Sequence, residues 1–298
     1  MLFDSLVKPI LLYGSDFWGC LKTPQNNPVE NLHMQFCRQI LGVQKNTTNN
    51  GVLLELGRTP LMLEAQRLSL KNWDRIKSGN GNTLVTNSYH NAHIMKLDWN
   101  ETVCSLLSKH GMHYRITESQ SDLGNAFFGK AKDIFHQEVF AQISDPKSKL
   151  RTYALIKESI GREDYLKDIR NTKHRQMLTK LRLSNHRLMI ELGRHKKLPK
   201  EERVCQICHG GIEDEIHFMT KCRPLEKLRE PLIASCYEIR PHFGYFSDEE
   251  KYIFLMTTPL LMGNVSKFVY SAFKERELII DVSTTVDDMI TKISSSPF

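Results

Sequence analysis

Four residues have the types and the spacing of ligands for one metal ion. Cys205, Cys208, His217 and Cys222 follow the pattern C-x2-C-x8-H-x4-C. A C-x2-C pair lets one tight turn present two thiolates to the same ion, and tetrahedral zinc takes four nitrogen or sulfur ligands. We therefore predict a zinc site with these four ligands. Because protein side chains fill every position, we expect the zinc to be structural rather than catalytic.

Two other residues near this pattern are rival ligands. His209 follows Cys208 directly, which makes coordination of one ion by both side chains sterically difficult, and Cys236 lies beyond the prolines at positions 224 and 231. Cysteines with no C-x2-C partner are expected to be reduced thiols in the core. Besides Cys236, these solitary cysteines are Cys20, Cys37 and Cys104.

The loop between the second and third ligands carries acidic and apolar residues. Adjacent carboxylates on a short loop are far more often solvated than catalytic. We therefore expect Glu213, Asp214 and Glu215 to form an exposed acidic edge. The apolar side chains expected to pack beneath the ion are those of Ile212, Ile216 and Phe218.

A second acidic pair, Asp287 and Asp288, resembles the paired aspartates with which polymerases hold magnesium. The serine and two threonines at 283–285 instead predict the start of a helix with acids in its first turn. The chain contains neither a phosphate-binding G-x-x-x-x-G-K-[ST] loop nor a G-x-S-x-G nucleophile motif. No residue is therefore assigned a catalytic role.

Composition places the chain among intracellular globular proteins. Its 298 residues, 40% of them hydrophobic, can form two domains with real cores. Charged residues and a proline interrupt the apolar N-terminus, and no run of eighteen uncharged apolar residues occurs, so we expect neither a signal peptide nor a membrane partner. Seven cysteines with a thiolate metal site fit a reducing compartment, the nucleus or the cytoplasm.

Positive charge is concentrated in one segment. Residues 147–200 contain sixteen Lys and Arg against five Asp and Glu, whereas the net charge of the whole chain is +7. A basic block beside a metal site predicts a polyanion partner, RNA or DNA. The predicted phosphate contacts lie on or just after an amphipathic helix over residues 173–193: Arg175, Lys180, Arg182, Arg187, Arg194, Lys196 and Lys197.

Helix signals dominate and predict a mostly α fold. Proline and cap residues open helices near Asn27 and Thr59, Asn100 is a plausible cap for a helix ending before Gly111, and residues 123–143 form another helix. Residues 2–18 predict a helix that enters a turn near Gly14. The basic helix is expected to break at 184–185, where the serine could cap a second helix. Further helices are predicted over 224–236 and 248–262.

These signals divide the chain into four predicted segments. Residues 1–78 form a helical N-terminal domain, 79–144 a helical connector, 145–236 the basic helices with the zinc site, and 237–298 a helical tail.

In ordered pieces the sequence resembles the C-terminal part, thumb and zinc knuckle, of the reverse transcriptases of non-LTR (LINE-type) retrotransposons. The resemblance covers about residues 1–75 and 145–232. It is carried by residues 2–19, 36–43, 55–61, 180–186, 190–194, 203–208 and 213–218.

The resemblance implies a thumb-like helical unit followed by a basic helical unit with a small CCHC zinc knuckle. It also implies that Cys205, Cys208, His217 and Cys222 bind zinc and that the basic helices contact RNA or DNA. The polymerase palm has no counterpart in this sequence, so we expect no polymerase activity from the chain alone. If the chain is made as part of a longer product, an upstream polymerase domain is a further expected partner.

An alternative from a different class is a protein-interaction module. In that case zinc only folds the knuckle, whose acidic or apolar face binds another protein. A fragment retained for use by the host, without a nucleic-acid role, belongs to the same alternative.

Overall fold

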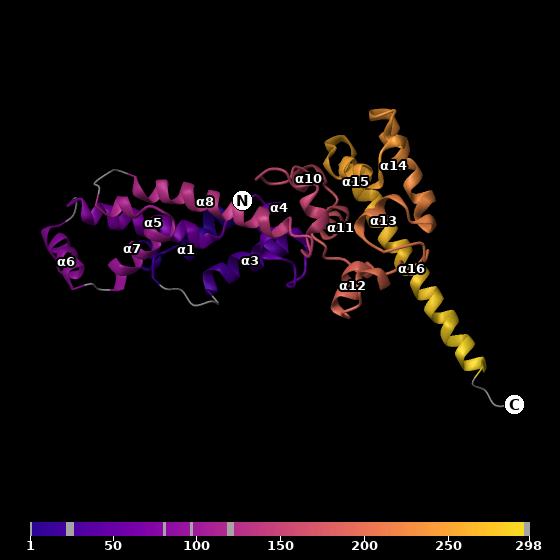
Figure 1. The fold of residues 1–298 in the computed structure, drawn as a ribbon, viewed down its shortest axis with the longest axis horizontal. Coiled ribbons are helices and arrows are strands. Elements are labelled where there is room, and N and C mark those ends of the chain that lie inside the picture. The colour runs from indigo at the N-terminus through magenta and orange to yellow at the C-terminus, as the bar shows by residue number, and fades with distance from the viewer. Residues whose placement is uncertain (1, 22–26, 80–81, 96–97, 118–121, 295–298) are drawn as a thin grey trace. The chain divides into compact units, whose positions relative to one another are not determined.

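The computed structural model describes residues 2–21, 27–79, 82–95, 98–117 and 122–294. Within these ranges the chain consists of helices and contains no named strand, so the predicted mostly α fold is confirmed (Figure 1). Two isolated β-bridges join Leu56 with Arg162 and Val204 with Ile212. No helix of the described part is both long enough and apolar enough to cross a membrane.

The chain divides into two compact units. Unit 1 is Met1–Cys37 with Arg58–Ala141, and unit 2 is Arg38–Gly57 with Gln142–Phe298. This division differs from the four predicted segments, because Arg38–Gly57 joins the C-terminal half of the chain. The physical reason is Glu55, whose buried hydrogen-bond partners, such as Arg182, come much later in the sequence.

Unit 1 begins with short helical turns and continues with longer helices. Its described elements are the π-helix η1 (Phe3–Val7), α1 (Lys8–Leu11), α2 (Ser15–Trp18), α3 (Pro28–Leu41, ending in unit 2), α5 (Leu61–Lys77), α6 (Thr83–Ile94), α7 (Asp98–Lys109), the 3-10 helix η2 (His113–Ile116) and α8 (Leu123–Ile143, ending in unit 2).

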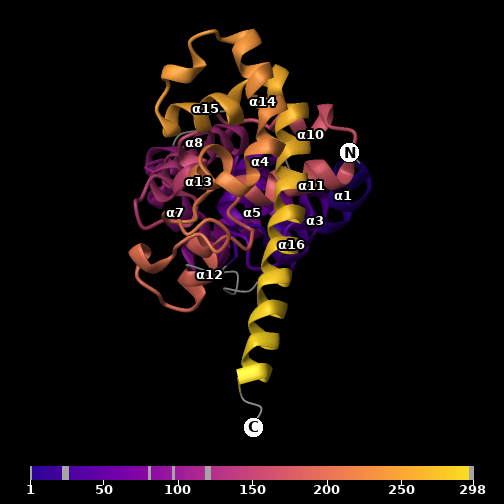
Figure 2. The same cartoon turned by 90° about the vertical axis from the view of Figure 1, so that its right-hand side faces the viewer.

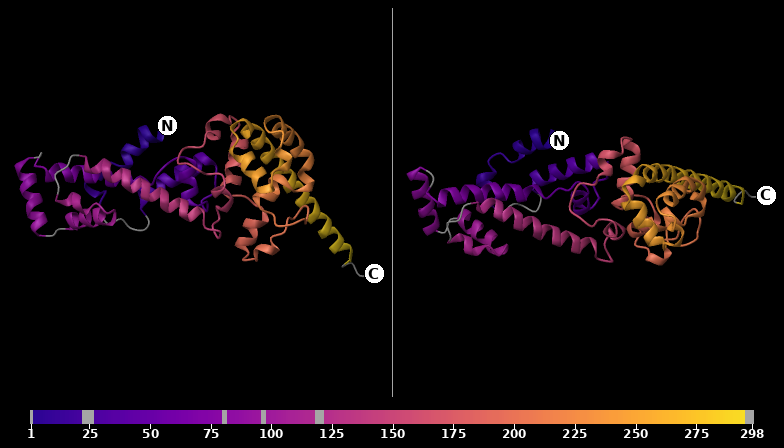
Figure 3. Two further views of the ribbon diagram at one scale, coloured as in Figure 1. Left: turned by 45° about the horizontal axis from the view of Figure 1, so that its top comes forward. Right: turned by 90° about the horizontal axis from the view of Figure 1, so that it is seen from above.

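The core of unit 1 lies between α5, α7 and α8. Trp73, Leu107 and Phe127 are buried there in one apolar cluster. Helices α5 and α8 run side by side (Figure 3). Gly124 permits this approach, because a Cβ at that position would lie 2.6 Å from the carbonyl oxygen of Arg67.

Several local predictions for this half of the chain are confirmed. The Asn27 side chain accepts a hydrogen bond from the Val29 amide at 2.9 Å and begins α3, and Gly42, with φ of +67°, ends it. The prediction for Asn100 was wrong. It lies inside α7 and is buried, where its side chain accepts a hydrogen bond from the indole of Trp73 at 3.0 Å instead of capping the helix.

Unit 2 is arranged around the long helix α16. This helix contacts α11, α14 and α15 (Figure 2). The described elements are α4 (Asn49–Glu55), α9 (Arg151–Ala154), α10 (Tyr165–Asp168), α11 (Thr172–Arg182), α12 (Met189–His195), η3 (Lys200–Glu202), α13 (Glu215–Thr220), η4 (Arg223–Leu225), α14 (Glu226–Ile239), η5 (Phe243–Tyr245), α15 (Asp248–Thr257), η6 (Pro259–Leu261) and α16 (Met262–Ser294).

Two predictions in unit 2 need correction. The break after α11 occurs, but Ser184 adopts a φ of +50° and donates its hydroxyl to Glu215, and α12 has no side-chain cap. No helix begins at residues 283–285, because α16 starts at Met262 and continues through them. The backbone at 287–288 is therefore helical, while the side chains of the predicted acidic pair lie outside the described residues.

A buried ion pair joins α4 to α11. Glu55 accepts hydrogen bonds from Arg182 at 2.7 Å and from the hydroxyls of Tyr153 and Tyr165 at 2.8 and 2.5 Å. Arg182 also donates to Glu163 at 2.6 Å. Burial and the charge of Glu55 raise the pKa of both tyrosines well above the usual value, so both remain hydrogen-bond donors.

Replacing Glu55 with glutamine is expected to lower the free energy of unfolding by about 3 kcal/mol, because it leaves the buried Arg182 poorly compensated. Urea titration followed by circular dichroism measures the loss. Lys221→Met is the control. It breaks an exposed pair with Asp248 in the same unit and should cost less than about 1 kcal/mol. Equal losses in the two variants would contradict a structural role for the buried pair.

Candidate metal centre

The first two predicted ligands lie in a tight hairpin. Its ends are held by hydrogen bonds from the Cys205 amide to the Gly211 carbonyl at 2.8 Å and from the Glu213 amide to the Arg203 carbonyl at 2.9 Å. Gly211 has a φ of +140°, which favours glycine. The hairpin therefore brings Cys205 and Cys208 to the same side of a short loop.

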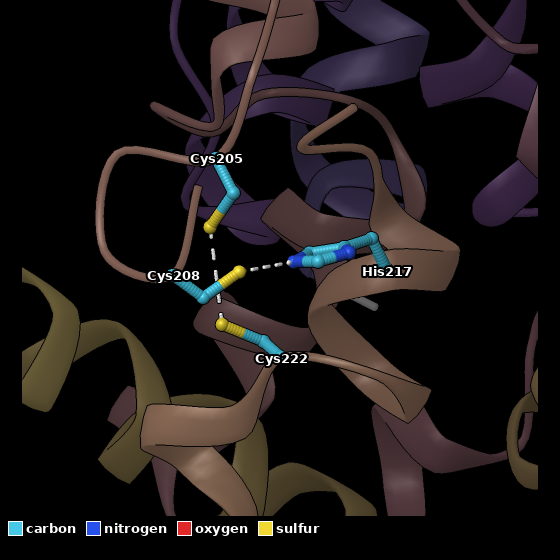
Figure 4. A group of neighbouring side chains, drawn as sticks. All are labelled: Cys205, Cys208, His217 and Cys222. Carbon is cyan, nitrogen blue, oxygen red and sulfur yellow. Dashed lines mark hydrogen bonds between the residues drawn. The ribbon is translucent and has the colours of Figure 1, made fainter. Parts of the chain in front are cut away.

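Helix α13 and the residues just after it supply the other two ligands. His217 lies in the first turn of α13, and Cys222 follows the helix as the N-cap residue of η4. Asp214 caps the helix by accepting a hydrogen bond from the His217 amide at 2.8 Å. A six-residue helix thus holds the imidazole and the last thiol against the hairpin (Figure 4).

The four side chains converge on one point. Their ligand atoms all lie within 4.8 Å of one another. The sulfur of Cys205 is 3.8 Å from that of Cys222, and the sulfur of Cys208 is 3.2 Å from Nε2 of His217 (Figure 4). Cys208 is half-buried and the other three are buried. This arrangement can hold a metal ion.

The contact between Cys205 and Cys222 perturbs both thiols. The hydrogen bond from Cys222 lowers the pKa of Cys205, and the same contact raises the pKa of Cys222. The Cys205 sulfur thus carries negative charge more readily than the Cys222 sulfur. A cation between them would stabilise both as thiolates.

Neither rival ligand belongs to the group. His209 is exposed and adopts a φ of +50°, so the chain turns away immediately after Cys208. Cys236 is buried in α14, where burial raises the pKa of its thiol to about 11. The four residues that the spacing predicted are the ones brought together.

The predicted acidic edge was wrong, because Glu213 and Glu215 are buried. Glu213 accepts two hydrogen bonds from Arg276 of α16, at 2.7 and 2.8 Å, and one from the Met189 amide at 2.8 Å. One of its oxygens is 3.5 Å from the sulfur of Cys205. Burial raises the pKa of this carboxyl despite Arg276. Glu213 therefore connects the hairpin to α12 and α16.

Glu215 occupies a second buried site. Its oxygens accept hydrogen bonds from Arg151 at 2.7 Å, from Ser184 at 3.0 Å and from His186 at 3.0 Å. Burial alone would raise the pKa of Glu215, but the hydrogen bond and charge of His186 and the charge of Arg151 outweigh it and lower the pKa to about 2. This carboxylate ties the start of α13 to α9 and to the turn after α11.

Arg229 also supports the ligand cluster, although it was not among the residues predicted from the sequence. Its buried guanidinium donates to the carbonyl oxygens of Met219 at 2.7 Å, Phe218 at 3.2 Å and Cys222 at 3.1 Å. Phe218 and Met219 lie in the last turn of α13, where the helix leaves its final carbonyls without an intrahelical partner, and Cys222 follows just after it. Arg229 therefore fixes the backbone that presents Cys222. Nothing in the local pattern separates Arg229 from the exposed cations around it.

Of the three apolar side chains predicted to pack beneath the ion, only that of Phe218 is fully buried. Phe218 is buried and stacks on Phe273 of α16 with ring centroids 4.5 Å apart. Ile212 and Ile216 are only half-buried. Aromatic packing between α13 and α16 thus supports the cluster.

The structure separates the predicted phosphate contacts into three groups. Arg182 is fully buried and paired with carboxylates, so its assignment as a phosphate contact is corrected. The half-buried residues are Arg175, Lys180 and Arg194. The Arg175 side chain donates to the Ile169 carbonyl at 2.8 Å, and that of Arg194 lies 3.8 Å from Glu191. The exposed members are Arg187, Lys196 and Lys197.

Comparison with known proteins does not place the chain in a family. No protein-family model matches it, and neither the curated proteins nor the solved structures include a significant match.

Replacing Arg276 with methionine is expected to lower the free energy of unfolding by about 3 kcal/mol, because Glu213 would remain buried without its cation. The measurement is thermal or urea unfolding at a fixed metal concentration. Lys274→Met is a matched control on the same helix, since Lys274 is exposed and should change stability by less than about 1 kcal/mol. If both variants unfold like the wild type, Arg276 does not support the hairpin.

Proposed function

We propose that the ion held by Cys205, Cys208, His217 and Cys222 is zinc and that it is structural. Three thiols and one imidazole form a soft donor set that zinc prefers over magnesium or calcium. In a tetrahedral site with Zn–S bonds of about 2.3 Å, two sulfurs lie about 3.8 Å apart. The 3.8 Å between Cys205 and Cys222 supports this choice.

The bound zinc would neutralise the thiolates and join the hairpin to α13. Four protein ligands fill a tetrahedral ion, so no position is left for a substrate or a reactive water. The residues around the ion hold it in place: Glu213 and Glu215 fix the loop, and Arg229 fixes the backbone at Cys222.

We further propose that unit 2 binds nucleic acid. The observation that carries this proposal is the occurrence, in one unit, of the closed Cys3His cluster and the exposed cations Arg187, Lys196 and Lys197. Lysine and arginine side chains that reach solvent can contact phosphates regardless of base sequence. Lys180, Arg175 and Arg194 have partly exposed side chains and can add contacts.

We also propose the origin of the chain: a C-terminal, non-catalytic part of a non-LTR retrotransposon reverse transcriptase, which would position RNA or DNA for a polymerase domain outside this sequence. Support comes from the resemblance of residues 203–208 and 213–218 and from the convergence of the four ligands that those segments largely supply. The protein-interaction alternative is weakened, because the acidic edge that favoured it is buried.

The purified chain is expected to carry about one zinc ion per molecule, measured by mass spectrometry of metals. With cobalt in place of zinc, the absorption bands of a tetrahedral thiolate site should appear. Cys205→Ser should remove the metal and the bands, while Cys104→Ser, which alters a half-buried cysteine outside the cluster, should keep both. A Cys205→Ser protein with full zinc content would contradict the ligand assignment.

For nucleic acid, the double variant Arg187→Glu with Lys197→Glu is expected to weaken binding of single-stranded RNA and DNA at least tenfold. It should also reduce the slope of log affinity against log salt by about 1.5, since each lost phosphate contact removes about 0.7 to 0.9. Fluorescence anisotropy over a salt series measures both effects.

The control for this experiment is Lys109→Glu with Lys132→Glu. It makes the same change of net charge at exposed positions of unit 1 and should leave most of the binding intact. Equal losses in the two double variants would mean that only net charge matters and would contradict a binding surface in unit 2.

A further inference from the structure

Helix α12 ends in a turn that carries two of the exposed cations of unit 2. The Lys197 amide donates to the Arg194 carbonyl at 3.1 Å, and the Leu198 amide donates to the Gly193 carbonyl at 2.8 Å. These are the two hydrogen bonds of a Schellman motif, in which the residue after the helix adopts a left-handed conformation. We call residues 196–198 the basic turn, because both of its lysines are exposed.

Lys197 occupies the left-handed position of the basic turn, with a φ of +57°. Glycine is the usual residue at this position, because a side chain crowds the backbone at positive φ. Holding another residue there costs free energy, and such positions cluster at functional sites. A cation also favours the C-terminus of a helix, but Lys196 already supplies one. A lysine in place of glycine therefore indicates a use for its exposed charge.

The side chain of Arg203 connects the basic turn to the metal-binding hairpin. Its guanidinium donates to the Leu198 carbonyl from two nitrogens, at 2.7 and 3.0 Å, and to the Ile190 carbonyl at 3.0 Å. The backbone carbonyl of Arg203 accepts the Glu213 amide at 2.9 Å, two residues before the ligand Cys205. One residue thus holds the end of the basic turn and closes the hairpin.

Gly193 makes room for the Arg203 side chain. It lies inside α12, where glycine lowers helix stability relative to alanine. A Cβ at this position would lie 2.6 Å from Cγ and 2.9 Å from Cδ of Arg203, closer than nonbonded carbons approach. The stem of Arg203 therefore packs directly on the α12 backbone, and the sequence keeps a destabilising glycine where that packing requires one.

These contacts form a continuous path from the metal ligands to the basic turn. An ion bound to Cys205 would fix the first half of the hairpin, and the hairpin fixes the backbone of Arg203. The Arg203 side chain then holds the turn that presents Lys196 and Lys197. Cations that are ordered before binding lose less conformational entropy when they meet a phosphate.

We propose that Arg203 is a positioning residue that couples the metal-binding hairpin to the basic turn, so that metal occupancy sets the affinity of unit 2 for nucleic acid. The inference rests on the proposed binding of nucleic acid and adds a means of its regulation. It concerns residues that all belong to unit 2.

Hydrogen exchange, measured by mass spectrometry on the full-length, metal-loaded chain, tests the coupling without nucleic acid. Arg203→Met should speed exchange of the amides of residues 196–198 about tenfold, because the turn opens more often without its anchor. Chelation of the metal from the wild type should have the same effect. Exchange in α15 should stay the same in Arg203→Met. Unchanged exchange in the basic turn of the variant would overturn the proposal.

Binding of single-stranded RNA, measured by fluorescence anisotropy over a salt series, tests the consequence. Arg203→Met should weaken binding about fivefold and reduce the slope of log affinity against log salt by about 1, because freed lysines make fewer phosphate contacts. A smaller folded fraction would leave the slope unchanged.

Two variants control for charge. Arg203→Lys keeps the charge but has one nitrogen in place of three donors, so it should bind RNA as weakly as Arg203→Met. Arg240→Met removes an exposed arginine of the same unit and should change affinity less than about twofold. Full affinity in Arg203→Lys, or equal losses in Arg203→Met and Arg240→Met, would mean that only charge matters and would contradict positioning.

A double-mutant cycle separates positioning from direct contact. Lys196→Gln with Lys197→Gln should weaken RNA binding about twentyfold, since two phosphate contacts are lost. Adding Arg203→Met to this variant should have no further effect, because the lysines that Arg203 positions are gone. Additive losses would show that Arg203 acts independently of the basic turn and would overturn the proposal.

The proposal and the function on which it rests fail in different ways. A wild type that binds neither RNA nor DNA would refute nucleic-acid binding, while the exchange data would still decide the coupling. A wild type that binds RNA equally well with and without the metal would refute control by the metal and leave nucleic-acid binding intact.

Discussion

Two buried carboxylates, Glu213 and Glu215, determine how the candidate metal centre is held in unit 2. Burying a carboxylate without a partner costs several kcal/mol, so each must have its cation and hydrogen-bond donors in place when the unit folds. Glu213 takes Arg276 from α16, and Glu215 takes Arg151 from α9. The two acids lie on either side of Asp214, which caps α13. Pairing each acid with its own cation therefore fixes the hairpin and the helix that position the four ligands.

This arrangement makes the candidate metal centre part of a larger core. In a free-standing knuckle the ion supplies nearly all the stability, and removal of the metal unfolds the whole element. Here the same loop is also bound to α16, α12 and α9, and Phe218 packs on Phe273. The ion would therefore determine the local positions of the ligands, while the surrounding helices depend mainly on ion pairs and apolar packing.

The basic block illustrates how net charge overstates a binding surface. Arg182 neutralises Glu55 in the interior, and Arg151 and Arg276 serve the two acids of the metal loop. Such cations contribute to composition but cannot reach a phosphate. What remains for a polyanion is the subset of side chains that face solvent.

The sequence alone determined the features that depend on near neighbours. The ligand set followed from C-x2-C-x8-H-x4-C, and the start of α3 and the extent of α8 followed from caps and periodicity. Only the tertiary structure decided which charges are buried. Glu55 and Arg182 are separated by 127 positions in the sequence, and Glu213 and Arg276 by 63, and no local pattern encodes such a partner. The same reason explains Asn100, whose place in the interior is set by Trp73 of another helix rather than by its own neighbours.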